Sequence, residues 1–182
     1  MDIQKIISLV TKTQGLIKNR EMAAHVKEKG LADYVTQVDI AVQNFLKKEL
    51  FALAPNIQFL GEETGLQEIK GDSFWILDPV DGTTNLMHDY QHSVVSLALC
   101  RQGEIVMGIV YDPFREEVFS AIKGKGSFLN GHPIHVSNAE KLSDTMIGLG
   151  TAKRELADEN FARFRRVFGQ CQDVRRIGSA AL

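Results

Sequence analysis

Hydrophobic positions in the first third of the chain recur at helical spacing. Five apolar residues of the N-terminal segment share one helical face: Ile3, Ile6, Ile7, Val10 and Ile17. Gly30 is expected in a loop before a second helix, for which Thr36 is a fitting N-cap, with Asp39 placed three residues later, close to a capping box. The buried face of this second helix continues to Leu53, and Pro55 ends it.

After Pro55 the apolar residues form short runs that are typical of buried strands. The predicted strands cover residues 57–60, 74–77, 94–101, 105–111, 118–122 and 128–136. Asn130-Gly131 divides the last run, and this dipeptide is the strongest short hairpin signal. Further on, we expect a strand at 146–149, a helix around 161–168 and a strand at 174–177.

Helices followed by a meander of strands and then by mixed elements predict an α+β fold built in layers. Repeats, low-complexity tracts and linkers are absent from the sequence, so residues 1–182 are expected to form a single domain. Residues 178–182 are interpreted as the first turn of a helix, and a helix of one turn is not stable alone. We therefore expect these residues to be part of a longer chain, and the 182-residue piece made alone to be inactive and poorly soluble.

Composition places the chain among ordinary globular proteins, with 44% apolar and 24% charged residues. A net charge of -2 provides no basic footprint for nucleic acid or an anionic membrane. The longest apolar stretch, at 94–100, is too short to cross a bilayer, and the N-terminus has no signal-peptide pattern. Cys100 and Cys171 have no partner at metal-binding spacing. These features favour a cytoplasmic protein with reduced cysteines.

The segment at 75–85 carries the clearest chemical signal. Asp78 and Asp81 follow a buried strand, and two carboxylates this close repel each other unless a cation lies between them. Mg²⁺ prefers such hard oxygen ligands. Residues 82–85 then offer small side chains and free N–H groups at an expected helix start, which is an anion site. The same string is also a common strand-turn-helix joint, so this segment alone leaves both interpretations open.

Two further acidic points strengthen the metal hypothesis. Glu62 and Glu63 end another predicted strand, so they could converge on Asp78, although an isolated Glu pair is more often a solvated turn. Asp33 and Asp39 frame a third acidic point, where helix capping alone would explain Asp39.

Four strings in this order and spacing resemble the inositol monophosphatase family. They are Asp33-Tyr34-Val35-Thr36-Gln37-Val38-Asp39, Gly61-Glu62-Glu63, Asp78-Pro79-Val80-Asp81-Gly82-Thr83-Thr84-Asn85 and Gly178-Ser179-Ala180-Ala181. The resemblance covers the whole chain. It implies a layered αβαβα sandwich whose C-terminal part is missing here, a lithium-sensitive Mg²⁺-dependent phosphomonoesterase, and a homodimer.

The resemblance also implies a role for individual residues. Glu62, Asp78 and the carbonyl of Val80 would bind one Mg²⁺, Asp78 and Asp81 would bind a second, and Glu62 would reach a third. Asp39 and Thr83 would be catalytic, together with Glu62, by orienting and deprotonating the attacking water.

The expected substrate-binding residues are Asp81, Gly82, Thr83, Gly178 and Ala180, with the phosphoryl group on the N–H groups of Gly82 and Thr83. A small-residue helix start would equally explain Gly178 and Ala180. The family's later Trp-Asp motif and substrate-binding Glu are absent from this sequence. The family's loop lysine corresponds to Lys27 or Lys29, and residues 150–160 receive no role.

The favoured substrate is inositol 1-phosphate, and relatives that act on fructose 1,6-bisphosphate or nucleotide 3'-phosphates are the alternatives. A second hypothesis is a regulatory binding module on the same fold, with contact to transcription machinery, which the charge does not indicate. His88, His92 and His135 are interpreted as surface or packing residues. Ser179 has no adjacent base, so a serine nucleophile is not supported.

Overall fold

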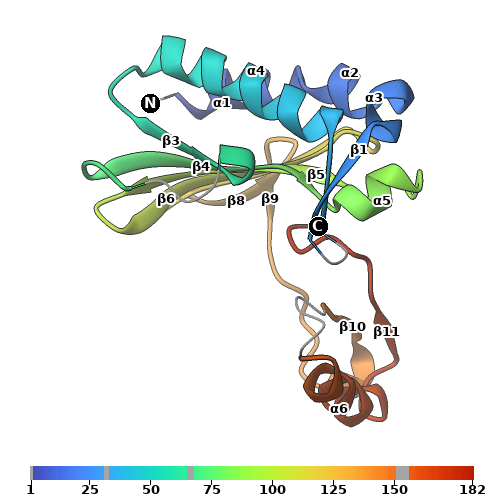
Figure 1. Cartoon of the computed structure of the whole chain (residues 1–182). Coiled ribbons are helices and arrows are strands. Elements are labelled where there is room, and N and C mark those ends of the chain that lie inside the picture. The colour runs from blue at the N-terminus through green and yellow to red at the C-terminus, as the bar shows by residue number, and fades with distance from the viewer. Residues whose placement is uncertain (1, 31–32, 65–67, 151–155) are drawn as a thin grey trace.

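The computed structural model describes residues 2–30, 33–64, 68–150 and 156–182. Four helices cover one face of a seven-stranded sheet, and a smaller group of C-terminal elements stands apart from that sheet (Figure 1). The α+β class and the layered arrangement are therefore as expected.

The covering helices are α1 (Ile3–Thr11), α2 (Gln14–Ile17), α3 (Arg20–Ala24) and α4 (Gln37–Leu53). The predicted N-terminal stripe is correct, but its helix breaks at Thr13, whose N–H and Oγ1 both donate to the carbonyl of Val10. Gly30, which was expected in a loop, lies instead at the end of a strand. The connection contains α3 and an antiparallel hairpin, β1 (Val26–Gly30) with β2 (Asp33–Thr36).

The large sheet has the strand order β3-β4-β5-β6-β7-β8-β9. Its strands are β3 (Gln58–Gly61), β4 (Ser73–Asp81), β5 (Val94–Arg101), β6 (Glu104–Asp112), β7 (Glu117–Ile122), β8 (Gly126–Leu129) and β9 (His132–Ile134). Only the β3–β4 pair is parallel among these described strands. Asn130 and Gly131 form the predicted hairpin turn with positive φ angles of 49° and 81°.

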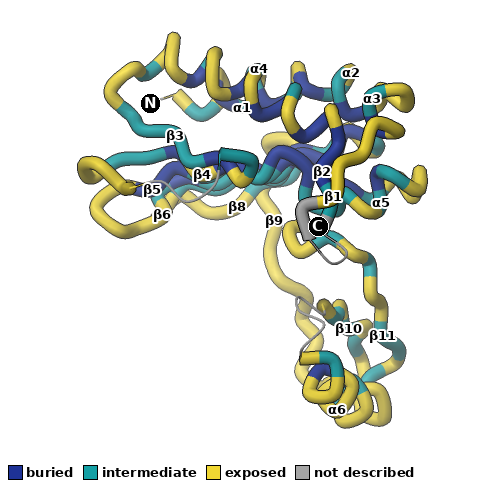
Figure 2. Tube along the Cα trace, viewed as in Figure 1, coloured by how far each residue is buried: buried dark blue, intermediate teal, exposed yellow. Residues whose placement is uncertain are grey.

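The core lies between the helices and the sheet (Figure 2). Buried side chains of α1 and α4 pack on those of β4, β5 and β6, among them Ile6, Val10, Val42, Leu46, Leu50, Trp75, Leu77, Leu97, Leu99 and Ile109. This packing fixes the N-terminus of α4 above one end of β4, so it determines which polar residues meet there.

The C-terminal group consists of β10 (Met146–Gly148), parallel to β11 (Asp173–Arg175), and α6 (Ala157–Phe168). These elements are mostly exposed (Figure 2). The predicted helical turn at 178–182 is wrong, because these residues are not helical. Ser179 Oγ does accept the N–H of Leu182 at 3.3 Å, as an N-cap would. That residues 1–182 form a single domain stays a prediction.

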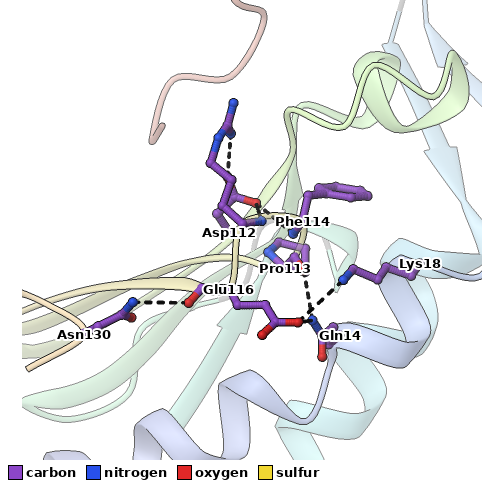
Figure 3. Close-up of polar contacts among 8 residues, drawn as sticks. Gln14, Lys18, Asp112, Pro113, Phe114, Glu116 and Asn130 are labelled. Atoms are coloured by element: carbon purple, nitrogen blue, oxygen red, sulfur yellow. Dashed lines mark hydrogen bonds and ion pairs between the residues drawn. The ribbon is translucent and has the colours of Figure 1, made fainter.

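A polar network joins the β6–β7 turn to α2 (Figure 3). The Asp112 side chain is fully buried and accepts two backbone N–H groups of the turn, at 2.8 and 3.1 Å, and the guanidinium of Arg115 at 2.7 Å. Gln14 Nε2 donates to the carbonyl of Pro113 at 3.0 Å and to Glu116 at 2.9 Å. Asp112 thus organises a turn whose backbone anchors α2.

Asp112→Ala is expected to lower the free energy of unfolding by about 2–3 kcal/mol, because the backbone N–H groups of Phe114 and Arg115 would lose their hydrogen-bond acceptor. Urea unfolding monitored by circular dichroism measures this change. Glu116→Ala is the control, since its side chain is 71% exposed, and should change stability by less than about 1 kcal/mol. Equal losses in the two variants would contradict this account of the turn.

Candidate active site

Residues from four elements meet at one end of the large sheet. The N-terminus of α4 supplies Asp39, the end of β4 supplies Asp78 and Asp81, and the 3₁₀ turn η1 (Glu62–Thr64) supplies Glu62. Thr83 is the first residue of the short helix α5 (Thr83–Met87), which follows β4 directly. The parallel register pairs Gly61 with Leu77, so the chain leaves β3 beside Asp78.

Asp39 is a buried carboxylate with three defined donors. The capping box forms as predicted, and Oδ2 accepts the N–H of Thr36 at 2.8 Å and its hydroxyl at 2.5 Å. Oδ1 accepts the hydroxyl of Thr83 at 3.1 Å, across 44 positions of sequence. The same hydroxyl lies 3.0 Å from the carbonyl of Val80. The structure therefore brings Asp39 and Thr83 into direct contact.

Asp78 lies in a cluster of like charges. Burial, together with the carboxylates of Glu62 and Asp81 and a hydrogen bond with Glu62, raises the pKa of Asp78 from 3.8 to about 8. The backbone N–H of Val80, 3.1 Å from Asp78 Oδ1, opposes this rise only weakly. A cation bound at the end of β4 would relieve both the burial of a charged Asp78 and its repulsion by Glu62 and Asp81.

Asp81 contacts the C-terminal segment of the chain. Its Oδ2 accepts the hydroxyl of Ser179 at 2.5 Å and the N–H of Ala181 at 2.6 Å. Asp81, Gly178 and Ala180 also line one cavity of about 620 Å³. Three of the five residues that were expected to bind substrate therefore line the same cavity, although Asp81 is far in sequence from Gly178 and Ala180.

The donor atoms at this site suit Mg²⁺. Glu62, Asp78, Asp81 and the carbonyl of Val80 all offer hard oxygen donors, the kind of ligand that Mg²⁺ prefers. Among the described residues, no group of three acidic, His or Cys side chains yet surrounds a single point.

Binding of Mg²⁺ at pH 7 is expected to release about one proton, because a pKa near 8 leaves metal-free Asp78 largely protonated. The folded state then binds more protons than the unfolded chain between pH 4 and 8, so the metal-free protein should lose stability as pH rises through that window. Calorimetry of Mg²⁺ binding in buffers of different ionisation enthalpy counts the proton. A binding heat independent of the buffer would contradict this assignment.

Two supporting residues escaped the sequence analysis. Gln43 is buried in α4, and its Oε1 accepts the N–H of Glu63 at 3.1 Å, which ties η1 to α4. A Cβ at Gly61, the last residue of β3, would lie only 2.1 Å from this Oε1, so a larger residue there would displace the Gln43 amide. The amide of Asn85, the last residue of the Asp-Pro string, bonds to the carbonyls of His92 and Ile177, each at 2.7 Å. The sequence offers two weak signals for these residues. Gln43 lies one turn after Asp39 on the same predicted helix, and Asn85 belongs to the string that also contains Asp78 and Asp81.

The remaining candidates have smaller parts. Lys27 is an exposed residue of β1, and the side chain of Lys29 lies outside the described residues. His88 and His135 are exposed, whereas His92 is partly buried beside the ring of Tyr90. Both cysteines are free thiols. In the described part of the chain, none of the helices has the length and apolar character needed to traverse a bilayer.

Comparison with known sequences gives one consistent answer. The sequence pattern of the inositol monophosphatase family matches residues 2–182. An inositol-1-monophosphatase of Rhizobium meliloti is 42% identical over 164 residues, which cover 86% of this chain and 60% of that protein. The Nus factor SuhB of Xylella fastidiosa is 37% identical over 166 residues, or 90% of this chain and 60% of that protein. The chain thus spans about 60% of the length of these curated relatives.

Solved structures show the same fold. The extragenic suppressor protein suhB of Bartonella henselae superposes with a TM-score of 0.91 at 32% identity, over 98% of this chain and 71% of that one. An IMPase/NADP phosphatase complexed with Mg²⁺ and phosphate superposes with a TM-score of 0.80 at 26% identity, over 97% and 67% of the two chains. With its four strings, its layered fold and a family match from residue 2 to residue 182, the chain belongs to the inositol monophosphatase family.

Proposed function

We propose that the protein containing this chain is a Mg²⁺-dependent phosphomonoesterase whose active site is the end of β4. The observation that carries this proposal is the contact between Thr83 and Asp39 beside the carboxylates of Glu62, Asp78 and Asp81. A hydroxyl that is hydrogen-bonded to a buried carboxylate can take a proton from a water molecule and pass one to the carboxylate. The neighbouring carboxylates of Glu62, Asp78 and Asp81 offer the oxygen atoms that bind Mg²⁺.

Asp39 and Thr83 act together on the attacking water. Both donors on Asp39 Oδ2 come from Thr36, so the carboxylate cannot rotate, and Oδ1 faces the hydroxyl of Thr83. Thr83 Oγ1 accepts a proton from the water while its own proton moves to Asp39 Oδ1. This relay orients the water and gives the released proton a defined place.

The metal ligands proposed here are the same residues that the family resemblance implies. Glu62, Asp78 and the carbonyl of Val80 would hold one ion, Asp78 and Asp81 a second, and Glu62 would also reach a third. Bound Mg²⁺ supplies a nucleophilic water at neutral pH and stabilises the leaving oxygen. The metal-bound IMPase/NADP phosphatase relative supports this choice of ion.

The substrate is held by backbone and small residues. Gly82 is the N-cap of α5 with a φ angle of 96°, so the N–H groups of Gly82 and Thr83 lie where the chain turns out of β4. We assign the phosphoryl group to these two N–H groups. Asp81, Gly178 and Ala180 line the adjacent cavity, where the alcohol portion would lie.

Inositol 1-phosphate is the substrate that the relatives' names favour, and the Rhizobium meliloti relative carries that activity in its name. The cavity of about 620 Å³ has room for a six-carbon ring and would also admit other small phosphate esters. The proposal therefore specifies the reaction more closely than the alcohol.

Phosphate release from a panel of esters tests this function. The panel contains inositol 1-phosphate, fructose 1,6-bisphosphate, a nucleoside 3'-phosphate and p-nitrophenyl phosphate, each with Mg²⁺, with EDTA and with added Li⁺. We expect Mg²⁺-dependent, Li⁺-inhibited release, fastest from inositol 1-phosphate. If the full-length protein released no phosphate from any ester at saturating Mg²⁺, the phosphatase assignment would fall.

The Nus factor SuhB relative favours a second candidate, a regulatory binding module. The 37% identity to that relative supports this candidate. The net charge of -2 does not support it, because a nucleic-acid-binding surface would be basic. A protein that lacks phosphatase activity but binds a transcription complex in pull-down experiments would favour this candidate. The homodimer implied by the family resemblance also stays a prediction, and light scattering tests it.

A further inference from the structure

The side chain of Asn85 links three segments around the proposed metal site. Each hydrogen of its Nδ2 group has an acceptor, one on the carbonyl of His92 and one on the carbonyl of Ile177, both at 2.7 Å. These acceptors lie 7 and 92 positions away in sequence. The amide is therefore a cross-link between the α5 turn and the C-terminal segment.

Two glycines pack directly on this amide. A Cβ at Gly178, where φ is 77°, would lie 2.8 Å from Asn85 Oδ1 and 3.1 Å from Nδ2. A Cβ at Gly82, where φ is 96°, would lie 2.9 Å from the carbonyl of His92 and 3.3 Å from Asn85 Nδ2. A Cβ at Gly178 would clash with the amide itself and one at Gly82 with the carbonyl that the amide bonds, and both φ angles are positive, so both positions favour glycine and the amide is confined from two sides.

The chain that Asn85 holds is the chain that contacts Asp81. Immediately after Ile177 it turns at Gly178, and the hydroxyl of Ser179 and the N–H of Ala181 then reach Asp81 Oδ2 at 2.5 and 2.6 Å. Two donors on one oxygen fix the rotation of a carboxylate, so its second oxygen also takes a defined direction. The path from Asn85 to Asp81 is continuous along the backbone of residues 177–181.

We propose that Asn85 and Ser179 form a clamp that orients Asp81 for Mg²⁺ binding. This inference rests on the proposed function, because it takes Asp81 to be a metal ligand. Asn85 is a positioning residue here, acting through residues 177–181, and Ser179 is the hydroxyl that contacts the ligand. The clamp explains why a serine without a neighbouring base lies at this site: it serves as a donor to a carboxylate.

The test measures Mg²⁺ affinity without turnover, by calorimetry on the full-length protein in the absence of substrate. Asn85→Asp keeps the shape of the side chain but replaces both donors by an acceptor, and Ser179→Ala removes the hydroxyl. Each should weaken Mg²⁺ binding by roughly 10–100-fold, the usual effect of losing a residue that orients a metal ligand. Ser179→Thr retains the hydroxyl and should restore affinity to within about threefold of wild type.

Asn130→Asp is the matched control, because Asn130 also bonds a carbonyl through Nδ2, at 3.3 Å, but in the β8–β9 turn. It should leave Mg²⁺ affinity unchanged. Urea unfolding in EDTA is measured alongside, so that lost stability is not mistaken for lost affinity, and the Ser179 pair decides the question if Asn85→Asp fails to fold.

The possible results separate the clamp from the function on which it rests. Wild-type affinity in both Ser179→Ala and Asn85→Asp would overturn the clamp and leave the phosphatase intact. A wild-type protein that binds no Mg²⁺ at all would overturn both. Equal weakening in Ser179→Ala and Ser179→Thr would show that bulk at this position matters and the hydroxyl does not, which also overturns the clamp.

Discussion

Asp81→Asn is expected to abolish Mg²⁺-dependent phosphate release while leaving the fold intact. Asp81 is a partly buried residue at the end of β4 and contributes no apolar packing to the core. Its amide analogue can still accept from Ser179 or Ala181, but it lacks the charge that a second Mg²⁺ requires. We expect kcat/KM to fall by at least about 10²-fold.

Steady-state kinetics over a wide range of Mg²⁺ concentrations measure this loss, and circular dichroism verifies the fold. Asp144→Asn is the control, because Asp144 is an exposed carboxylate of the 3₁₀ turn η2 (Leu142–Asp144) whose Oδ1 also accepts a serine hydroxyl. It should have wild-type kinetics. Near-normal activity of Asp81→Asn at ordinary Mg²⁺ would show that the assignment of Asp81 as a metal ligand is wrong.

Thr83→Ala should lower kcat on the order of 10²-fold with a smaller change in KM. The substitution removes the hydroxyl that bonds to Asp39 and leaves the backbone N–H groups that would hold phosphate. Thr83→Ser keeps the hydroxyl and is expected to retain most of kcat. A normal kcat with a large rise in KM would instead make Thr83 a substrate-binding residue.

Local signals in the sequence predicted the local structure well. The capping box of Thr36 and Asp39 depends on three consecutive peptide units, and the hairpin at Asn130-Gly131 depends on two residues that tolerate positive φ. The same holds for the end of α4 before Pro55. Such features need no knowledge of the rest of the chain.

Features that depend on distant residues were harder to predict. The hairpin of β1 and β2 was missed because residues 26–36 lack an alternating apolar pattern, and charged side chains fill β1. The helix expected after Gly178 is absent. Ser179 nevertheless accepts the N–H of Leu182, so the local capping contact forms although residues 178–182 are not helical.

The candidate site shows the same division. The family resemblance selected its carboxylates and Thr83, and the structure brings Asp39 together with Thr83 and Asp78 together with Glu62. Gln43 and Asn85 were missed because an amide in a helix or turn gives no sign of the carbonyl or N–H group that it will meet. Gln43 meets the N–H of Glu63 because α4 packs beside η1, and Asn85 meets the carbonyl of Ile177 because the C-terminal segment passes beside α5.

The central claim is that the carboxylates at the end of β4 hold a divalent ion. Anomalous diffraction from crystals of the full-length protein grown with Mn²⁺, which prefers the same oxygen ligands as Mg²⁺, tests it most directly. The account predicts a strong anomalous peak bonded to Glu62 and Asp78 at about 2.0–2.3 Å, and its loss in Asp78→Asn. Saturating Mn²⁺ that supports phosphate release but leaves these carboxylates without a peak would contradict the account.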